Sequence, residues 1–530
     1  MSNKNNKIEH THTHTQNSKE SQRNELFRVI WKIANDLRGS IDGWDFKQYI
    51  LGTLFYRFIS ENFCKYISET DDENYENIKD SEISNELKQE FIKEKGFFIY
   101  PSQLFCNVLK NTKDEEYKKH LNENLSNILK SIENSSFGTK SEEDFKGLFS
   151  DYDVNSNKLG GTIEERNKRL IQLLTAVSTL DFGDLEDNSI DLFGDAYEYL
   201  MAMYASNAGK SGGEFFTPQE VSELLARLAI GQRTTIKKVY DPACGSGGLL
   251  LKFAKILGKD NVKIGFFGQE KNPTTFNLCR INMFLHNINY SKFEIALGDT
   301  LLKPQLKDSI PFDAIVSNPP YSVQWEGDSD PLLINDPRFS PAGVLAPKSK
   351  ADFAFIMHCL SYLSTDGTAA IVEFPGTLYR GGAEEKIRKY LIDNNYIDCI
   401  IQLPGNLFFG TSISTCIIVL KKSKKTNDVV FIDASKEYET NTNSNKLTQQ
   451  NISNIYKYFN ERKDIEFIVK VASYDEIVKK NYNLSVNNYV ISEDTSEIID
   501  IEEINKELEV TVKKIETLRA EINKIVKEIG

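Results

Sequence analysis

Cysteine is scarce in this sequence, and the seven cysteines show no spacing that would give them a structural role. None of them forms a Cys-x-x-Cys pair or another spacing typical of a metal site. The chain also lacks a recognisable signal peptide and any apolar run of transmembrane length. These absences argue against a disulfide scaffold, a bound metal and a membrane protein, and they predict reduced thiols in a cytoplasmic protein.

Basic residues are also fewer than acidic residues. The 530 residues include 64 Lys and Arg against 77 Asp and Glu, which gives a net charge of −13 and a pI of about 5.3. A protein that holds DNA by itself is usually basic, because neutralising phosphates supplies most of the affinity. The chain is therefore a poor candidate for binding DNA without a partner.

A complete phosphate-binding loop is missing as well. Gly209-Lys210-Ser211 has the ending of such a loop, but Tyr204 stands five positions before Gly209, where glycine is required. The sequence therefore predicts no ATP site. Apolar residues, in contrast, are plentiful: they make up 40% of the chain, with 32 Phe and 23 Tyr, which is enough for the cores of two or three domains.

The beginning of the chain divides into two segments. Residues 1–22 are polar and without periodicity, and His10, His12 and His14 alternate with threonines there. We predict a disordered tail, which we favour over a weak metal site. Apolar side chains then recur at i, i+3, i+4 and i+7, so residues 23–170 are predicted to form a helical N-terminal domain.

The rest of the chain divides into three segments. Residues 171–425 alternate strand and helix patterns, and residues 426–490 form a mixed connecting region. Within 491–530, apolar positions alternate steps of 3 and 4 at Ile501, Ile504, Leu508, Thr511, Ile515, Leu518, Ile522, Ile525 and Ile529. This seam over about four heptads predicts a coiled-coil-like amphipathic helix. We favour packing against a partner chain over folding back on its own domain.

The most informative motif, Asn318-Pro319-Pro320-Tyr321, follows the apolar run 312–317. Prolines fix φ and donate no N–H, so the carbonyls beside them stay free to accept. The Asn318 side-chain oxygen and the Pro319 carbonyl could each accept one hydrogen of a planar –NH2 group, while Tyr321 stacks on its ring. Accepting both hydrogens localises the nitrogen lone pair and directs it at an electrophile. A strand that ends in a simple turn is the alternative.

A glycine-rich turn upstream indicates a nucleotide-like ligand. A short β-rich segment ends in Asp241, and an apolar helix start follows after Gly245, Ser246, Gly247 and Gly248. Glycines at such a turn let the backbone approach a ligand and let strand and helix pack closely.

Polar residues also end the strands that follow. Glu270 follows the run 264–268 and lies 22 residues beyond Gly248, about where nucleotide-binding α/β folds place the acid that holds ribose hydroxyls. Asp299 follows the run 293–297 in the same way. Consecutive strands with polar residues at their carboxyl ends predict the crevice of a doubly wound α/β sheet. Further strands are predicted at 368–374, 397–403 and 415–421.

Taken in order, these motifs resemble those of the amino-methyltransferases that use S-adenosyl-L-methionine. More narrowly, the chain resembles the modification subunit of type I restriction-modification systems, an N6-adenine DNA methyltransferase family. The resemblance includes the segments 33–39, 46–52, 195–200 and 481–489 and covers most of residues 23–530. It implies a Rossmann-like methyltransferase catalytic domain at 171–425, between a helical N-terminal domain and the C-terminal helix.

The resemblance also implies roles for the motif residues. The methionine end of the cofactor would be lined by Glu214, Phe215, Phe216, Thr217, Pro218 and Gln219. The glycine-rich turn would lie above Asp241, Glu270 would take the ribose hydroxyls and Asp299 the adenine amino group. Asn318, Pro319, Pro320 and Tyr321 would be the catalytic residues. Asn at the first of these positions accompanies adenine N6 as the target, whereas Ser more often accompanies cytosine N4.

Partners are implied by the same resemblance. They are a DNA-specificity subunit that binds a pair of modification subunits, a restriction and translocation subunit in the full complex, and duplex DNA. The target adenine would be flipped out of the duplex, because a stacked base cannot reach Asn318. A partner that supplies most DNA contacts agrees with the net charge of −13. No segment between the motifs is long enough for a recognition domain, so another chain would set the target sequence.

Three other functions compete with this one. A cytosine-C5 mechanism needs a Cys nucleophile, usually after proline, and the chain has no Pro-Cys dipeptide. Enzymes that methylate a glutamine side chain of release factors share the Asn-Pro-Pro-Tyr motif, but they are generally shorter and lack a long C-terminal seam helix. A protein glutamine-amide methyltransferase therefore remains the alternative function. A non-catalytic scaffold is disfavoured by the intact set of motif residues.

Overall fold

The computed structural model describes residues 24–33, 45–71, 74–182, 194, 196, 198–200, 217–327, 330–408, 412–440, 444–491 and 501–529. The predicted tail at 1–22, the tripeptide Gly209-Lys210-Ser211 and the candidate residues Glu214, Phe215 and Phe216 lie outside the described residues. The chain forms two compact units, Met1–Val490 and Ile491–Gly530.

The described N-terminal residues are helical. Residues 24–33 form one helix, followed by α2 (Asp45–Asp71), α3 (Asn85–Lys95), α4 (Phe105–Asn111), α5 (Glu115–Lys119), α6 (Leu121–Asn134), α7 (Glu142–Phe145) and α8 (Ile163–Ser178). The apolar positions that predicted helices are buried: Leu54, Phe55 and Phe58 of α2 are all less than 5% exposed. Position 170, where the sequence suggested a domain boundary, lies inside α8.

The rest of the first unit is built on a nine-stranded sheet with the order β11-β8-β6-β7-β5-β4-β1-β2-β3. Its strands are β1 (Ile236–Asp241), β2 (Val262–Glu270), β3 (Phe293–Leu297), β4 (Phe312–Ser317), β5 (Leu363–Glu373), β6 (Ile397–Gln402), β7 (Cys416–Lys421), β8 (Val429–Asp433) and β11 (Val469–Ala472). The neighbours from β3 to β5 pair in parallel, whereas β7 is antiparallel to both β5 and β6. A separate small ladder joins β9 (Glu439–Thr440) and β10 (Asn445–Lys446).

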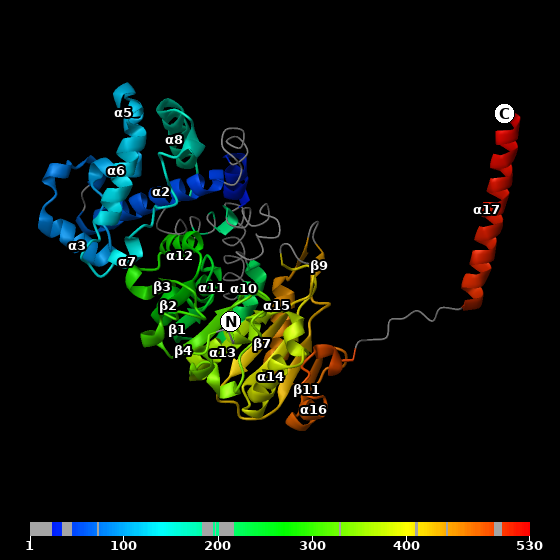
Figure 1. Cartoon of the computed structure of the whole chain (residues 1–530). Helices are drawn as coiled ribbons and strands as arrows, with labels where there is room; N and C mark the ends of the chain where they lie inside the picture. Colours follow the sequence, from blue (N-terminus) through cyan, green and yellow to red (C-terminus); the bar gives the residue numbers. More distant parts are fainter. Residues whose placement is uncertain are drawn as a thin grey trace, which may run out of the picture. The chain divides into compact units, whose positions relative to one another are not determined.

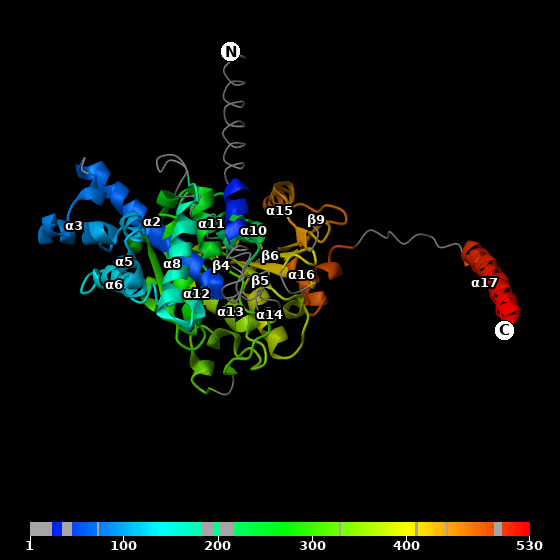
Figure 2. The same ribbon diagram turned by 90° about the horizontal axis from the view of Figure 1, so that it is seen from above.

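Helices cover both faces of the sheet (Figure 1 and Figure 2). Successive strand residues belong to opposite apolar clusters, with Val239 and Val316 in one and Tyr240 and Ile315 in the other. The first cluster includes buried residues of α10 (Gln219–Ile230), α11 (Gly248–Leu257), α12 (Pro273–Leu285) and α15 (Gln449–Glu461). The second includes those of α13 (Asp352–Tyr362), α14 (Ala383–Asp393) and α16 (Tyr474–Lys479). The predicted doubly wound α/β fold is confirmed.

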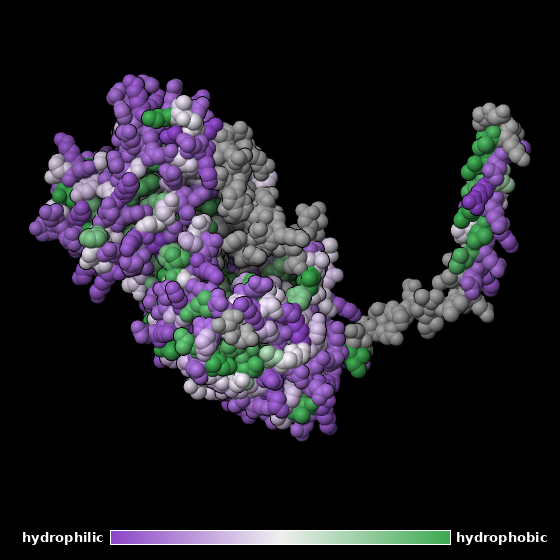
Figure 3. Space-filling view, viewed as in Figure 1, coloured by the Kyte–Doolittle hydropathy of each residue, from purple (hydrophilic) through white to green (hydrophobic). Residues whose placement is uncertain are grey.

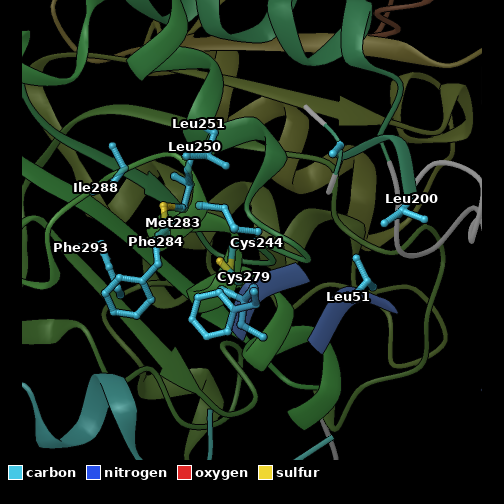
Figure 4. Close-up of a cluster of buried hydrophobic side chains, with 14 of the residues drawn as sticks. Leu51, Leu200, Cys244, Leu250, Leu251, Cys279, Met283, Phe284, Ile288 and Phe293 are labelled. Atoms are coloured by element: carbon cyan, nitrogen blue, oxygen red, sulfur yellow. The ribbon is translucent and has the colours of Figure 1, made fainter. Parts of the chain in front are cut away.

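The helical N-terminal region packs on α12. Buried side chains of α2, α11, α12 and β3 belong to one apolar cluster, part of which Figure 4 shows. Arg280 of α12 is 2% exposed, and its Nη1 donates to the backbone carbonyls of Asp144 and Lys146, both at 3.1 Å. Asn277, one turn earlier, donates to Ser150 Oγ at 2.8 Å. These bonds hold the N-terminal helices against the half of the sheet that carries β1, β2 and β3.

The second unit contains the helix α17 (Ile501–Ile529). The described members of its predicted seam face solvent, and Leu508, Ile515, Leu518, Ile522 and Ile525 are each more than half exposed. Figure 3 shows these hydrophobic residues gathered along one side of the helix. Within the second unit, no other described helix or strand covers this apolar stripe. None of the helices in the described residues is long and apolar enough to cross a membrane.

Candidate active site

Four of the candidate residues lie at strand ends near the point where the order of the sheet reverses. The chain passes from β1 outward to β2 and β3, and then returns to the other side of β1 as β4. Asp241 and Glu270 are the last residues of β1 and β2, and Asp299 and Asn318 follow β3 and β4. Because these strands are parallel, their carboxyl ends lie at one edge, and in doubly wound sheets a reversal of this kind is where ligands bind.

The glycine-rich turn joins β1 to α11. Gly245 and Gly247 have φ of +54° and +82°, a region that other residues seldom adopt. A side chain at Gly247 would also place its Cβ 2.8 Å from Cys279 Sγ of α12. A Cβ at Gly248, the first residue of α11, would have no neighbouring atom of another described element within 4 Å. The turn is therefore tightly packed behind Gly247 and open beside Gly248, where the first N–H groups of the helix lack intrahelical partners.

Asp241 connects this turn to the end of β4. The side chain is fully buried, and its Oδ1 accepts from Ala243 N at 3.0 Å and from Ser317 Oγ at 3.1 Å. Its Oδ2 is buried and accepts no hydrogen bond from a described residue. Burial raises the pKa of Asp241 to about 7. A donor on a bound ligand would satisfy this oxygen and favour the charged form of the carboxyl group.

Glu270 and Asp299 shape the neighbouring loops. Glu270 accepts from Gly245 N with Oε2 at 3.0 Å and from Asn272 N with Oε1 at 2.7 Å. Asp299 Oδ1 accepts from Leu301 N at 3.0 Å, and its Oδ2 forms an ion pair with Lys271 Nζ at 2.8 Å. A carboxylate oxygen can accept more than one hydrogen bond, so both side chains retain capacity for a ligand.

The tetrapeptide contacts the segment predicted to line the cofactor. Asn318 is half-buried, its Nδ2 donates to Thr217 Oγ1 at 3.1 Å, and its Oδ1 accepts from the Tyr321 hydroxyl. Burial raises the pKa of Tyr321 well above its usual value, so the hydroxyl keeps the proton that it donates. The sequence predicts only a stacking role for the Tyr321 ring. Pro319 is buried and Pro320 half-buried, which holds the turn rigidly behind Asn318.

Thr217, Pro218 and Gln219 begin α10 beside Asn318. Pro218 is the residue before the helix, and Gln219 is its first residue. The side-chain oxygen of Gln219 is buried and has no hydrogen-bond donor among the described residues. An unpaired buried acceptor is unfavourable, so this oxygen suits a donor on a ligand at the crevice.

Two carboxyl groups behind the tetrapeptide were not predicted. Asp352, the first residue of α13, accepts from Ser322 N at 2.9 Å and so holds the residue that follows Tyr321. Glu373, the last residue of β5, is fully buried, and neither of its carboxyl oxygens has a partner among the described residues. Burial, followed by the nearby charge of Asp352, raises the pKa of Glu373 well above its usual value. The signal was present in the sequence, because Glu373 lies at the end of a predicted apolar strand, as Asn318 does.

Comparison with known proteins identifies the family. The model of the family described as N-6 DNA Methylase matches residues 188–498, and that of the HsdM N-terminal domain matches residues 26–177. The chain is 48% identical over 525 residues to the type I restriction enzyme MpnII methylase subunit of Mycoplasma pneumoniae, a match that covers 96% of this chain and 97% of that one. The chain belongs to the N-6 DNA methylase family, among the methylase subunits of type I restriction enzymes.

Solved structures agree with this N-6 DNA methylase assignment. The type I restriction-modification methyltransferase subunit from Streptococcus thermophilus is 35% identical, with a TM-score of 0.80 over 88% of this chain and 99% of that chain. A chain from another type I restriction-modification system is 20% identical, with a TM-score of 0.64 over 96% of this chain and 99% of that chain, and shares the fold. The family predicted from the motifs and the predicted fold are both confirmed.

Proposed function

We propose that this N-6 DNA methylase transfers a methyl group from S-adenosyl-L-methionine to N6 of a specific adenine in duplex DNA, as the modification subunit of a type I complex. The observation that carries the proposal is the position of Asn318. Its side chain lies at the carboxyl end of β4, at the reversal of the sheet, and is oriented by Thr217 and Tyr321. An oriented amide beside a cofactor crevice suits the capture of an amino group.

The residues at the crevice fit the proposed cofactor. The open space beside Gly248 and the positive φ angles of Gly245 and Gly247 allow a ligand to approach the backbone. The buried oxygens of Gln219 and Asp241, which have no donor among the described residues, can accept hydrogen bonds from it. We assign Thr217, Pro218 and Gln219, with Glu214, Phe215 and Phe216 before them, to the methionine end. Glu270 would hold the ribose hydroxyls, Asp299 would hold the adenine amino group, and Ser246 would contribute to the turn.

When bound, the cofactor supplies a methyl group on a positively charged sulfur, which is already reactive. The contribution of the chain is therefore to hold the target amino group in line with this methyl group. Asn318 Oδ1 and the Pro319 carbonyl accept the two hydrogens of the adenine amino group, which localises its lone pair. The Tyr321 hydroxyl holds the Asn318 amide in the accepting orientation. The Tyr321 ring would stack on the flipped base.

The proposed complex contains a DNA-specificity subunit, which binds a pair of these modification subunits, and a restriction and translocation subunit. Two features of the chain support a division of labour. Its net charge of −13 disfavours tight DNA binding by the chain alone. The exposed stripe of α17 offers a seam for helices of the specificity subunit. We therefore assign docking to α17 and the choice of target sequence to the partner.

The proposal is tested with labelled cofactor and two acceptors. The chain, alone and co-expressed with the specificity subunit of its own system, is incubated with duplex DNA and with a release factor. We expect label in DNA only, and only with the specificity subunit present. Label in a release-factor glutamine would instead support the amide methyltransferase. Absence of label in both acceptors, with cofactor bound, would leave the scaffold function.

A further inference from the structure

Arg338 is a buried arginine in the segment between β4 and α13, downstream of the catalytic tetrapeptide. Its side chain is 5% exposed. A guanidinium group carries five N–H donors, and an unpaired one is costly when it is buried. The partners of these five donors therefore show what the residue holds in place.

Two of the donors hold the turn that follows Asp299. Arg338 Nη1 donates to the carbonyl of Thr300 at 2.8 Å, and Nη2 donates to the carbonyl of Leu301 at 2.6 Å. The same turn is closed by Asp299 Oδ1, which accepts from Leu301 N at 3.0 Å. The Thr300 hydroxyl donates to the carbonyl of Pro242 at 2.5 Å, which ties the turn to the end of β1. Arg338 thus fixes the backbone from which the Asp299 carboxylate projects.

The other three donors fix the guanidinium itself. Nε and Nη2 donate to the two carboxylate oxygens of Asp336, at 3.0 Å to Oδ1 and 2.8 Å to Oδ2. Nη1 lies 3.1 Å from His358 Nδ1, and His358 Nε2 lies 2.9 Å from the Tyr240 hydroxyl. Burial, and then the charge of Arg338, lowers the pKa of His358 well below its usual value, so the ring is neutral. Nδ1 accepts from Arg338, and Nε2–H is left to donate to Tyr240.

All five donors of Arg338 therefore have an acceptor, and the positions of these acceptors suit the planar shape of a guanidinium group. A lysine ammonium has three donors at one point and cannot reach both carbonyls, Asp336 and His358 together. We propose that Arg338 is a positioning residue for adenine recognition: it holds the Asp299 turn in the geometry that lets the carboxylate accept from the adenine amino group of the cofactor. This inference rests on the role of Asp299 in the proposed function.

The test measures discrimination between two cofactors. Calorimetry gives the Kd of the full chain for S-adenosyl-L-methionine and for its analogue with hypoxanthine in place of adenine, which lacks the amino group. The wild type should prefer the adenine form by roughly tenfold to a hundredfold, as expected for one hydrogen bond to a charged group. Arg338→Lys should reduce this ratio to less than about threefold, because the carboxylate is no longer held in place. A general loss of structure would weaken both ligands equally and leave the ratio unchanged.

Two further variants serve as controls. Asp336→Asn keeps an oxygen that accepts from the guanidinium and leaves both bonds to the turn, so its ratio should stay within about twofold of the wild type. Asp299→Ala should lose the discrimination. If it keeps it, the proposed role of Asp299 fails. If Asp299→Ala loses the discrimination but Arg338→Lys retains the wild-type ratio, the inference about Arg338 is overturned and the proposed function stands.

Folding of the lysine variant is followed by its thermal unfolding midpoint. Where that variant does not fold, His358→Phe carries the test, because it removes the acceptor that fixes Nη1 and so loosens the bond of Nη1 to the Thr300 carbonyl. Its ratio should fall by about threefold, as expected when the support of one hydrogen bond at the turn is weakened. A wild-type ratio in His358→Phe would overturn the inference.

Discussion

Replacing Asp241 with asparagine should stabilise the ligand-free protein at neutral and alkaline pH. The amide side chain of the variant keeps an oxygen for Ala243 N and Ser317 Oγ, so the change mainly removes a buried charge. The pKa of Asp241 is about 7 in the folded chain, against roughly 4 for an unfolded Asp. The folded state therefore binds the proton more tightly, and wild-type stability falls as pH rises from about 4 to about 7. Each pKa unit is worth about 1.4 kcal/mol, so the fall amounts to a few kcal/mol.

Urea unfolding at pH 5, 6, 7 and 8 measures this difference. We expect an advantage of about 1.5 kcal/mol for Asp241→Asn at pH 5, which grows to about 4 kcal/mol at pH 8. Burial also raises the pKa of Asp144 to about 7, but Asp144 is present in both proteins, so the difference between them isolates Asp241. The variant should bind cofactor more weakly. Parallel stability curves from pH 5 to pH 8 would refute the reasoning.

Three further changes test the site and the seam. Tyr321→Phe keeps the ring but loses the hydroxyl that orients Asn318, so methylation should slow roughly three- to tenfold at unchanged cofactor affinity. A wild-type rate would show that the hydroxyl does not orient Asn318 for the reaction. Glu270→Ala should weaken cofactor binding by about 1.5–3 kcal/mol in calorimetry, and an unchanged affinity would place the ribose contact elsewhere. Deleting residues 497–530 should spare cofactor binding but prevent co-purification with the specificity subunit, whereas co-purification at full yield would contradict docking by α17.

The strands that position the site were predictable from local pattern. The mainly apolar runs at 293–297 and 312–317 are the strands β3 and β4. β4 is buried along most of its length, whereas β3 lies at the edge of the sheet and is partly exposed. The polar residues that follow them, Asp299 and Asn318, meet at one edge because parallel strands align their carboxyl ends. Strands that each end in a polar residue are typical of a doubly wound parallel sheet, so the order of the motifs also predicted the fold.

The outer part of the sheet was not predictable in the same way. The sequence pattern places the runs at 429–433 and 469–472 in a connecting region, but they form β8 and β11. β7 lies between β5 and β6 and runs antiparallel to both. Short apolar runs carry no information about which distant strand they pair with, so their place depends on tertiary packing.

Side-chain contacts between distant segments were also beyond the sequence. The bond from Tyr321 to Asn318 depends on the turn that two prolines impose, and the contacts of Arg338 join residues about 40 positions apart. Glu373 shows the limit most clearly. Its place near the end of a predicted strand is visible in the sequence, but only the structure shows that its carboxyl group is buried without a partner among the described residues. Motif order thus predicts the family and the site, and packing determines how each side chain acts.

The identity of the methylated base tests the central claim most directly. The chain is assembled with its specificity subunit, reacted with duplex DNA and cofactor, and the DNA is hydrolysed to nucleosides for mass spectrometry. We predict N6-methyladenine from the wild type, and a decrease of at least about a hundredfold with Asn318→Ala, since losing the acceptor raises the barrier by several kcal/mol. Cofactor binding should remain nearly intact in that variant. N4-methylcytosine as the product, or N6-methyladenine formed by Asn318→Ala within about tenfold of the wild-type rate, would contradict the account.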